Sequence, residues 1–234
     1  MIKAVTFDFW NTIAQVPPGS MPEVRRRAVA AVCAEGGFEV GSELLTAGLD
    51  EVRMRWERSW GEGVHLHPQE GAAMLVEALG LEEAAGRPVV EAFLGAGREV
   101  EMEFAPDIGP ALEQLRERGL RLGIVCDVGF SGGELLRELL DGKGLLEHFD
   151  GWSFSDETGT YKPASGAFEA ALSALGARPD EAMHVGDLRR TDVAGAAALG
   201  MRTVRYRGMQ DDAEPGPEAE AVVDAHLELL GLIE

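Results

Sequence analysis

Two kinds of apolar pattern alternate along this chain, and they divide it into parts. Short uninterrupted apolar runs, such as those that end at Phe7, Val125 and Val185, are typical of strands buried on both faces of a sheet. Between residues 21 and 98 the apolar positions recur instead at intervals of three and four, which indicates helices. The pattern therefore predicts one strand at the start of the chain and a block of helices directly after it.

From about Phe104 onward, expected helices and strands alternate. The expected strands cover residues 120–126, 152–155, 182–185, 202–206 and 221–223, and the expected helices cover 106–118, 133–140, 164–175, 191–199 and the residues from Ala225. Such alternation is typical of βαβ units, in which helices cover both faces of a parallel sheet. We therefore predict an α/β fold, a doubly wound parallel sheet with an inserted α-helical block.

Start and stop signals define four helices inside that block. They run through Val24 to Val32, from an N-cap at Ser42 to Val52, from the start at His67-Pro68 to Leu79, and from Arg87-Pro88 through Phe93. Gly80 ends the third of them. Near the other end of the chain, residues 211–220 are acidic and contain prolines, which predicts a loop.

The charge of the chain limits its partners. The 234 residues are 45% hydrophobic and 26% charged, close to the average of soluble proteins, but the formal net charge is −20. Binding to nucleic acid or to an anionic membrane surface requires a basic footprint, so we expect neither partner. The chain begins with a core strand rather than a secretion signal, and no apolar run reaches the roughly 20 residues of a membrane span. We expect a cytoplasmic monomer or homodimer.

The two cysteines, Cys33 and Cys126, lie far apart in the sequence. They have no metal-ligand spacing, and they do not suggest a disulfide framework.

Asp8 is the first candidate for chemistry. It ends the first strand, and Thr12 follows four residues later in the turn. A carboxylate at the carboxyl end of the first strand of an α/β chain lies where such folds bind ligands. It can act as a covalent nucleophile, as in aspartyl-phosphate enzymes. A helix-capping or turn role is the structural alternative.

Three later segments carry further candidates. Cys126-Asp127 ends a strand, Lys162-Pro163 precedes a helix, and Gly186-Asp187 ends another strand, with Asp192 in the next segment. We expect all four segments, the first included, to end strands of one parallel sheet, so that their side chains converge at its carboxyl edge.

This order of an acid, a small polar residue, a Lys-Pro and a Gly-Asp with a further Asp resembles the haloacid dehalogenase-like hydrolase superfamily, whose members are mostly magnesium-dependent phosphatases. The resemblance covers nearly the whole chain. It implies an α/β core formed by residues 1–15 and 100–234 and a helical cap formed by residues 16–99, which selects the substrate.

The resemblance also implies a Mg²⁺ site and a reaction. Asp8 and Asp187 would hold the ion together with the backbone carbonyl of Trp10, and Asp192 would contribute directly or through water. Asp8 would attack the phosphorus of a small phosphorylated metabolite and form an aspartyl-phosphate, while Lys162 offsets negative charge. The groups implied to hold phosphate oxygens are Thr12, Cys126 and the backbone amides of the Asn11 and Asp127 loops.

Each of these residues also has a structural interpretation. Lys162 would be a surface lysine at a helix start, Asp187 a helix cap, Asp192 a first-turn residue favoured by the helix dipole, Cys126 a small core residue, and His184 a packed strand residue.

Trp10 departs from the family pattern. Family phosphatases usually carry a second Asp two residues after the nucleophile as general acid and base, and such help is worth about 10²–10⁴-fold in rate. On a first hypothesis the chain is a phosphatase whose proton comes from Asp127, Glu70 or His67, or whose leaving group needs none.

Dehalogenation is a second hypothesis that accounts for Trp10. A metal-independent 2-haloacid dehalogenase would also use Asp8 and carries an aromatic residue where Trp10 stands. Such enzymes lack an acid at Asp187 and use an Arg in the loop after the nucleophile, whereas Arg25 is the first Arg here. On a third hypothesis the chain is a catalytically weak protein that binds a phosphorylated ligand or a protein partner.

Overall fold

A computed structural model describes residues 1–233, and their contacts group the chain into two compact units. The first unit comprises residues 1–15, 103–127 and the chain from residue 140 onward. The second comprises residues 16–102 and 128–139. The core and cap bounds given above, 1–15 with 100–234 and 16–99, stay a prediction, and the grouping by contacts adds residues 128–139 to the helical part.

A six-stranded, wholly parallel sheet forms the centre of the first unit, in the order β5-β4-β1-β6-β7-β8. Its strands are β1 (Ala4–Phe7), β4 (Arg121–Cys126), β5 (Gly151–Phe154), β6 (Ala182–Gly186), β7 (Arg202–Tyr206) and β8 (Ala221–Val223). The predicted α/β class is confirmed. From β1 the strand order continues to β4 on one side and to β6 on the other, and ligands of such folds bind at the carboxyl ends beside this reversal.

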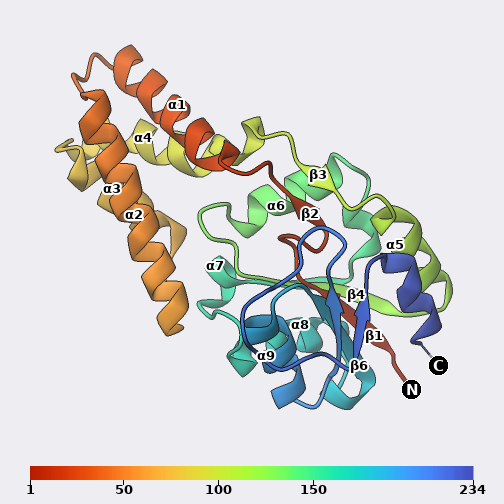
Figure 1. Cartoon of the computed structure of the whole chain (residues 1–234). Coiled ribbons are helices and arrows are strands. Elements are labelled where there is room, and N and C mark those ends of the chain that lie inside the picture. The colour runs from red at the N-terminus through yellow and green to blue at the C-terminus, as the bar shows by residue number, and fades with distance from the viewer. Residues whose placement is uncertain (234) are drawn as a thin grey trace. The chain divides into compact units, whose positions relative to one another are not determined.

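The other elements of the first unit connect and cover these strands (Figure 1). They are the antiparallel pair β2 (Ala14–Gln15) and β3 (Glu103–Phe104), the helices α5 (Ile108–Glu117), α7 (Ser155–Thr158), α8 (Ser165–Leu175) and α9 (Ala194–Ala198), the 3-10 helices η2 (Leu146–His148), η3 (Pro179–Glu181) and η5 (His226–Gly231), and a π-helical turn, η4 (Arg189–Val193). The helix α6 (Gly133–Asp141) begins in the second unit and ends in the first. The β2–β3 pair was not predicted, and the helix expected from Ala225 is the shorter 3-10 helix η5.

Alternate residues of β1 face opposite layers, because side chains of a strand point to the two faces of the sheet in turn. Ala4 joins the apolar cluster that α8 and α9 form on one face. Phe7 points to the other face, where its ring lies 6.3 Å from the ring of Phe149 and 6.1 Å from that of His226. Burying such a side chain contributes about 1.5–3 kcal/mol, so both faces of this strand stabilise the fold.

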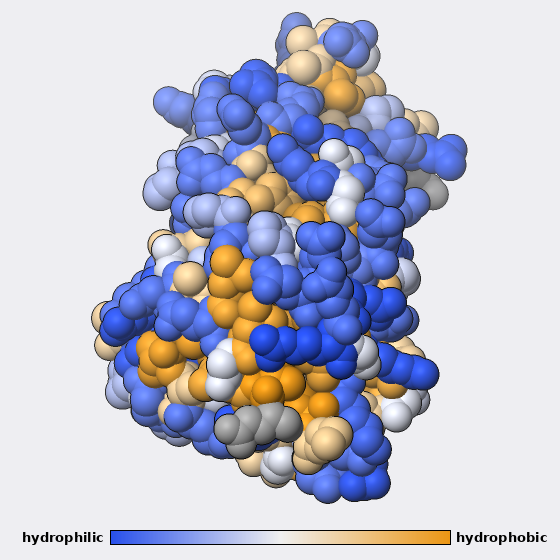
Figure 2. Space-filling model, turned by 90° about the vertical axis from the view of Figure 1, so that its right-hand side faces the viewer, coloured by the Kyte–Doolittle hydropathy of each residue, from blue (hydrophilic) through white to orange (hydrophobic). Residues whose placement is uncertain are grey.

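The acidic loop at residues 211–220 is confirmed as a connection between β7 and β8, and buried Arg205 holds it in place. The guanidinium of Arg205 lies 2.5 Å from Asp211 and 2.8 Å from Glu218. These ion pairs raise the pKa of Arg205 above its ordinary value and lower that of Glu218 to about 2. Most of the face drawn in Figure 2 is hydrophilic, with a hydrophobic area in the lower half of the view.

The second unit consists mainly of helices, as predicted. They are α1 (Ser20–Glu35), α2 (Ser42–Glu62), α3 (Pro68–Ala78), α4 (Glu83–Gly95) and the 3-10 helix η1 (Ala96–Glu99). His67 caps α3, in a capping box with Glu70, so this predicted start is confirmed. Two details were wrong: Gly41 rather than Ser42 is the N-cap of α2, and Pro88 lies inside α4 instead of opening it.

An apolar core joins these four helices to residues 128–139. Val29, Leu45, Leu75 and Phe93 contribute from the helices, and Phe130 contributes from the segment after β4. Cys33 is a buried free thiol in this core. No helix in the described part of the chain is both long and apolar enough to cross a membrane.

Paired glycines let α8 approach the sheet. Gly123 of β4 and Gly151 of β5 are register partners. A Cβ on Gly151 would lie 2.7 Å from Cβ of Ala174, and one on Gly123 would lie 2.9 Å from Cδ1 of Leu175.

We therefore expect Gly151→Ala to displace α8 and to reduce the free energy of unfolding by about 1–3 kcal/mol. Denaturant titration would measure this change.

Gly109→Ala is the matched control for this prediction. Gly109 lies in α5, and a Cβ there would have its nearest contact at an ordinary 3.5 Å. Alanine favours a helix over glycine by up to about 1 kcal/mol, so this variant should be as stable as the wild type or more stable. Equal unfolding midpoints for Gly151→Ala and the wild type would contradict the steric argument.

Candidate active site

The carboxyl ends of three adjacent strands bring the predicted acids together. Asp8 follows β1, Asp187 follows β6, and Cys126 ends β4. The backbone N–H of Asp8 donates to the carbonyl of Val185, 2.8 Å away, which ties the start of the first loop to β6. The segments that end at Asp8, Cys126 and Asp187 therefore meet at one edge of the sheet, as expected.

Lys162 also lies beside these acids, but it comes from a different kind of segment than expected. It does not end a strand but lies in the loop between α7 and α8. Its ammonium Nζ donates to Oδ1 of Asp8 at 2.5 Å and to Oδ1 of Asp192 at 2.6 Å. Its backbone N–H donates to Oδ1 of Asp127 at 3.1 Å. The side chain is only 3% exposed, so the interpretation of Lys162 as a surface lysine is wrong.

Asp192 is held by several donors besides Lys162. Its Oδ2 accepts from the backbone N–H of Leu188 at 3.1 Å and from the hydroxyl of Thr191 at 3.3 Å. Its Oδ1 lies 3.1 Å from Nε2 of His184. Both oxygens are thus engaged, and the carboxylate is fixed in one orientation.

His184 is a buried member of this network that sequence reasoning assigned to packing alone. Its ring does pack edge-on against Phe168, with centroids 5.0 Å apart. In addition its Nδ1 lies 2.9 Å from the hydroxyl of Thr6. Burial lowers the pKa of His184 even though Asp192 opposes that effect, so the ring is neutral at pH 7. Since a carboxylate only accepts, we assign the ring proton to Nε2, facing Asp192, and the Thr6 hydroxyl donates to Nδ1.

A signal for this pair was present in the sequence. Thr6 and His184 are polar residues inside apolar runs, and they are register partners on neighbouring strands. The glycine of the Gly-Asp motif also has a steric reason. A Cβ on Gly186 would lie 2.3 Å from Cγ of Asp192, so only glycine allows that carboxylate to approach the strand.

Three buried carboxylates lie close together at this edge of the sheet, and two of them, Asp8 and Asp192, contact the ammonium of Lys162. Asp8, Asp187 and Asp192 each offer one oxygen, and these oxygens lie within 4.8 Å of one another. All three residues are buried, and Oδ2 of Asp187 has no hydrogen-bond partner. A buried carboxylate oxygen without a partner is costly, and a hard cation such as Mg²⁺ prefers oxygen ligands of this kind. The donor set therefore fits a divalent cation.

The pKa shifts reflect the same excess of negative charge. Burial raises the pKa of Asp8 to about 7, although Lys162 opposes it, and burial together with the charge of Asp8 raises that of Asp187 to about 8. Burial also favours a higher pKa at Asp192, but Lys162 and His184 outweigh this effect and hold the pKa of Asp192 below its usual range. Burial lowers the pKa of Lys162, yet Asp192 and Asp8 overcome it and keep the ammonium charged.

The remaining predicted residues lie in the loops around these acids or are engaged elsewhere. Thr12 is fully buried and its hydroxyl has no partner, and Asn11 has a positive φ of 55°. Burial raises the pKa of Cys126 well above its usual value, so the thiol stays protonated. The ring of Trp10 packs edge-on against that of Phe9, 5.1 Å away between centroids.

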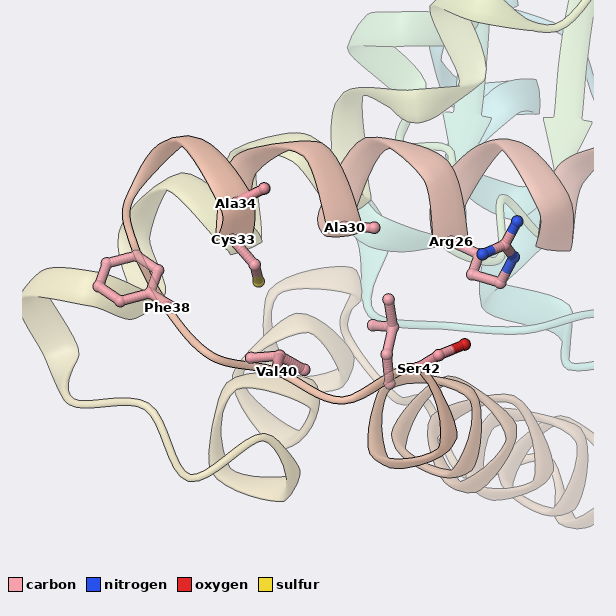
Figure 3. A pocket seen from close by; sticks show the side chains of 8 residues that line it. Arg26, Ala30, Cys33, Ala34, Phe38, Val40 and Ser42 are labelled. Carbon is pink, nitrogen blue, oxygen red and sulfur yellow. The ribbon is translucent and has the colours of Figure 1, made fainter.

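A separate cavity of about 160 Å³ lies between α1 and α2 of the second unit (Figure 3). Its lining is Arg26, Ala30, Cys33, Ala34, Phe38, Val40, Ser42 and Leu45. None of the predicted site residues belongs to it, and its wall is mainly apolar.

Comparison with known proteins places this geometry in context. Residues 2–200 match the family model described as haloacid dehalogenase-like hydrolase. The chain is 32% identical to a glyceraldehyde 3-phosphate phosphatase of Methanopyrus kandleri, over 100% of this chain and 97% of the relative. It is 30% identical to a ribulose-1,5-bisphosphate 5-phosphatase of Halopiger xanaduensis, over 96% and 90%.

Solved structures of two kinds are similar to it. A 2-haloacid dehalogenase from Pseudomonas syringae has a TM-score of 0.72 and 25% identity, with 99% of this chain and 98% of that one covered. A phosphatase from Thermococcus onnurineus has a TM-score of 0.62 and 25% identity, with 99% and 97% covered.

The raised pKa of Asp187 predicts how stability depends on pH when divalent cations are removed by EDTA. Its folded-state pKa of about 8 lies above the ordinary 3.8, so folding favours the protonated form. The contribution of Asp187 to stability is therefore greatest at a pH below its ordinary pKa of 3.8, and it is lost as the pH rises to about 8. Thermal unfolding in EDTA should show a lower Tm at roughly pH 9 than at roughly pH 6.

Asp187→Asn removes this titration. We expect the variant to exceed the wild type in Tm by about 2–4 °C or more at roughly pH 9 in EDTA, the shift that about 1 kcal/mol produces in a chain of this size. Mg²⁺ should raise the Tm of the wild type but not of the variant. Asp180→Asn, at an exposed position, is the control and should behave as the wild type. A variant less stable than the wild type in EDTA would contradict the electrostatic argument.

Proposed function

We propose that this chain, which belongs to the haloacid dehalogenase-like hydrolase family and is a hydrolase, acts as a phosphatase on a small phosphomonoester. The observation that carries the proposal is the unpartnered, buried Oδ2 of Asp187 beside Asp8. A second carboxylate at this position serves a divalent cation, and a reaction without metal would give it no task. The two phosphatase relatives that align over nearly their whole lengths support the same activity.

In the proposed reaction, a carboxylate oxygen of Asp8 attacks phosphorus while the ester oxygen leaves with its bonding electrons. The product is an aspartyl-phosphate, which water then hydrolyses to inorganic phosphate and the free carboxylate. Lys162 stabilises the charge that develops on the phosphoryl oxygens, and its bond to Asp192 fixes the ammonium in position. The hydroxyl of Thr12 lies in the loop after β1 and has no partner of its own, which supports a role for it in holding a phosphoryl oxygen.

Mg²⁺ is the cation we propose, with Asp8, Asp187 and the backbone carbonyl of Trp10 as ligands and Asp192 in a supporting position. When bound, it would offset the repulsion between an anionic nucleophile and an anionic phosphate. We assign Asp192 mainly to holding the ammonium of Lys162 in position, because both of its oxygens already accept hydrogen bonds from protein donors. The amides of the Asn11 and Asp127 loops and the residue Cys126 complete the proposed phosphate-binding wall.

Trp10 has no acidic group, so it cannot donate the proton that the leaving group needs. Asp127 is the proposed donor, because it is only half-buried and its Oδ1 is fixed next to Lys162 by the backbone N–H of that residue. Glu70 and His67 are weaker candidates, since the capping box of α3 engages both. We further propose that residues 16–99 act as the cap and that the enzyme is a cytoplasmic monomer or homodimer.

A second candidate function is 2-haloacid dehalogenation. Trp10 favours it, since an aromatic residue stands there in such enzymes, and a dehalogenase is among the similar structures. It would use Asp8 but neither Mg²⁺ nor a proton donor. Chloride release from a 2-haloacid in the presence of EDTA would support this function in place of the phosphatase.

The decisive experiment measures phosphate release from a panel of small phosphomonoesters with Mg²⁺ and with EDTA. We expect metal-dependent release that falls by about 10⁴-fold or more in Asp8→Asn, because that variant lacks the nucleophile. Asp180→Asn controls for the loss of a carboxylate elsewhere in the same unit and should retain full activity. Absence of release from every ester, with the protein folded, would reject the phosphatase.

Lys162→Ala tests the electrostatic role separately. Removing one fixed group that stabilises transition-state charge lowers kcat by about 10²–10³-fold, and we expect a loss of that size. Lys143→Ala, at an exposed lysine, should leave kcat unchanged. Equal kcat values for Lys162→Ala and the wild type would exclude Lys162 from the reaction.

A further inference from the structure

The direction of the Asp187 carboxylate depends on the backbone on both sides of it. Its Oδ2 has no hydrogen-bond partner among residues 1–233, so no protein donor in that range orients this oxygen. Asp187 directly follows β6, which ends at Gly186, and the π-helical turn η4 begins two residues later at Arg189. Contacts that fix the backbone at Gly186 and at Arg189 therefore limit where the carboxylate points.

A buried residue of the acidic loop, Asp212, holds the start of η4. Asp212 is only 6% exposed, and its Oδ2 accepts from the backbone N–H of Arg189 at 2.8 Å. The first N–H groups of a helix have no partner inside it, and Leu188, the N-cap of η4, supplies no side-chain cap. Asp212 therefore caps this turn from a segment that lies 23 residues later in the chain.

Further hydrogen bonds fix Asp212 itself. Its Oδ1 accepts from the backbone N–H of Glu214 at 2.9 Å, so both carboxylate oxygens are engaged. Its backbone carbonyl accepts from the guanidinium of Arg189. Asp212 and Arg189 thus each bind the backbone of the other residue through a side chain, which couples the acidic loop to the turn in two directions.

The same loop is also anchored on the strand side of Asp187. Arg205 of β7 is the register partner of Gly186, the last residue of β6. Nε of Arg205 donates to Oε1 of Glu218 at 2.8 Å, and Nη2 of Arg189 donates to Oε2 of the same carboxylate at 3.0 Å. One loop residue therefore links the strand beside Asp187 with the turn that follows it.

The backbone of the loop lies directly against the turn. A Cβ on Gly216 would lie 2.6 Å from Cβ of Arg189 and 3.4 Å from its carbonyl carbon. A separation of 2.6 Å is far shorter than the 3.5–4.0 Å at which two carbon atoms attract each other best. Glycine is therefore required at this position if the loop is to keep its contacts with Arg189.

We propose that Asp212 is a positioning residue, which holds the backbone after Asp187 so that Oδ2 of Asp187 stays beside Asp8 to bind a divalent cation. The inference rests on the proposed phosphatase function, for which Mg²⁺ is the proposed cation. Groups that orient a metal ligand without touching the metal are typically worth about 10- to 100-fold in metal affinity. All the residues involved belong to the first unit.

The first test measures the Kd of Mg²⁺ by calorimetric titration of the metal-free protein. We expect Asp212→Ala to raise this Kd by about 10- to 100-fold, because the turn after Asp187 loses its cap. Asp211→Ala is the matched control, since it removes the same charge from the neighbouring residue, which pairs with Arg205. Its Kd should stay within about twofold of the wild-type value.

The dependence of turnover on Mg²⁺ separates positioning from catalysis. Asp8 and Lys162 are retained in Asp212→Ala, so saturating Mg²⁺ should restore phosphate release to near the wild-type rate. At low Mg²⁺ the variant should release phosphate more slowly than the wild type. A rate that stays low at saturating Mg²⁺ would contradict a role that acts only through the cation.

Two milder variants keep the test decisive if Asp212→Ala is unfolded in a thermal scan. Asp212→Asn retains one acceptor oxygen, so its Kd for Mg²⁺ should lie between those of the wild type and Asp212→Ala. Gly216→Ala removes no charge but pushes the loop away from Arg189, and it should also raise the Kd. Wild-type Kd values in both of these variants would overturn the inference.

Hydrogen exchange in EDTA tests the hold on the turn without any cation. We expect Asp212→Ala to speed amide exchange in residues 187–193 by about 5- to 10-fold, as the loss of one hydrogen bond does. Exchange in β1 and β4 should stay unchanged, and so should exchange in residues 187–193 of Asp211→Ala. Exchange that rises evenly over the first unit would make Asp212 a general stabilising residue and overturn the inference.

The two measurements distinguish failure of this inference from failure of the proposed function. Equal Kd values for Asp212→Ala and a wild type that binds Mg²⁺ would overturn the positioning role alone. A wild type that binds no Mg²⁺ would count against the proposed function, and hydrogen exchange then decides. Faster exchange confined to residues 187–193 supports the hold of Asp212 on the turn, and unchanged exchange there overturns it.

Discussion

The buried ammonium of Lys162, shared between Asp8 and Asp192, is the interaction on which the rest of the candidate active site depends. A charge enclosed in a protein is tolerated only where partners surround it. Here the partners come from the loop after β1 and from the π-helical turn after β6, while Lys162 itself comes from the loop before α8. One ion-pair network thereby holds together three loops at the carboxyl edge of the sheet.

Two neighbouring residues, Gly186 and His184, meet the steric and electrostatic requirements of this network. Gly186 leaves the space that the Asp192 carboxylate occupies, and neutral His184 donates to it without adding a second cation. The balance of charge remains negative, because the ammonium of Lys162 pairs with Asp8 and Asp192 while Asp187 adds a third buried carboxylate. This imbalance costs folding free energy and concentrates negative potential at the site that we propose for a divalent cation.

Much of this arrangement could be predicted from the sequence, because it depends on strand ends. Apolar runs that stop at an acid predict both a parallel sheet and a shared edge, and Asp8 and Asp187 follow from that pattern alone. Lys162 was identified from its place before Pro163, although not from the correct element. Thr6 and His184 were missed because their pairing depends on strand register, and 178 residues separate them in the chain.

The assignment of residues 128–139 to the helical unit has a consequence for how such units are exchanged between proteins. The chain passes between the two units at residues 15/16, 102/103, 127/128 and 139/140, so the helical unit is encoded in two separate stretches. Phe130, from the shorter stretch, fills the core beside Phe93 and Trp56. A graft of residues 16–102 alone would transplant four helices without the ring at their centre, and recombination that preserves this unit has to move both stretches together.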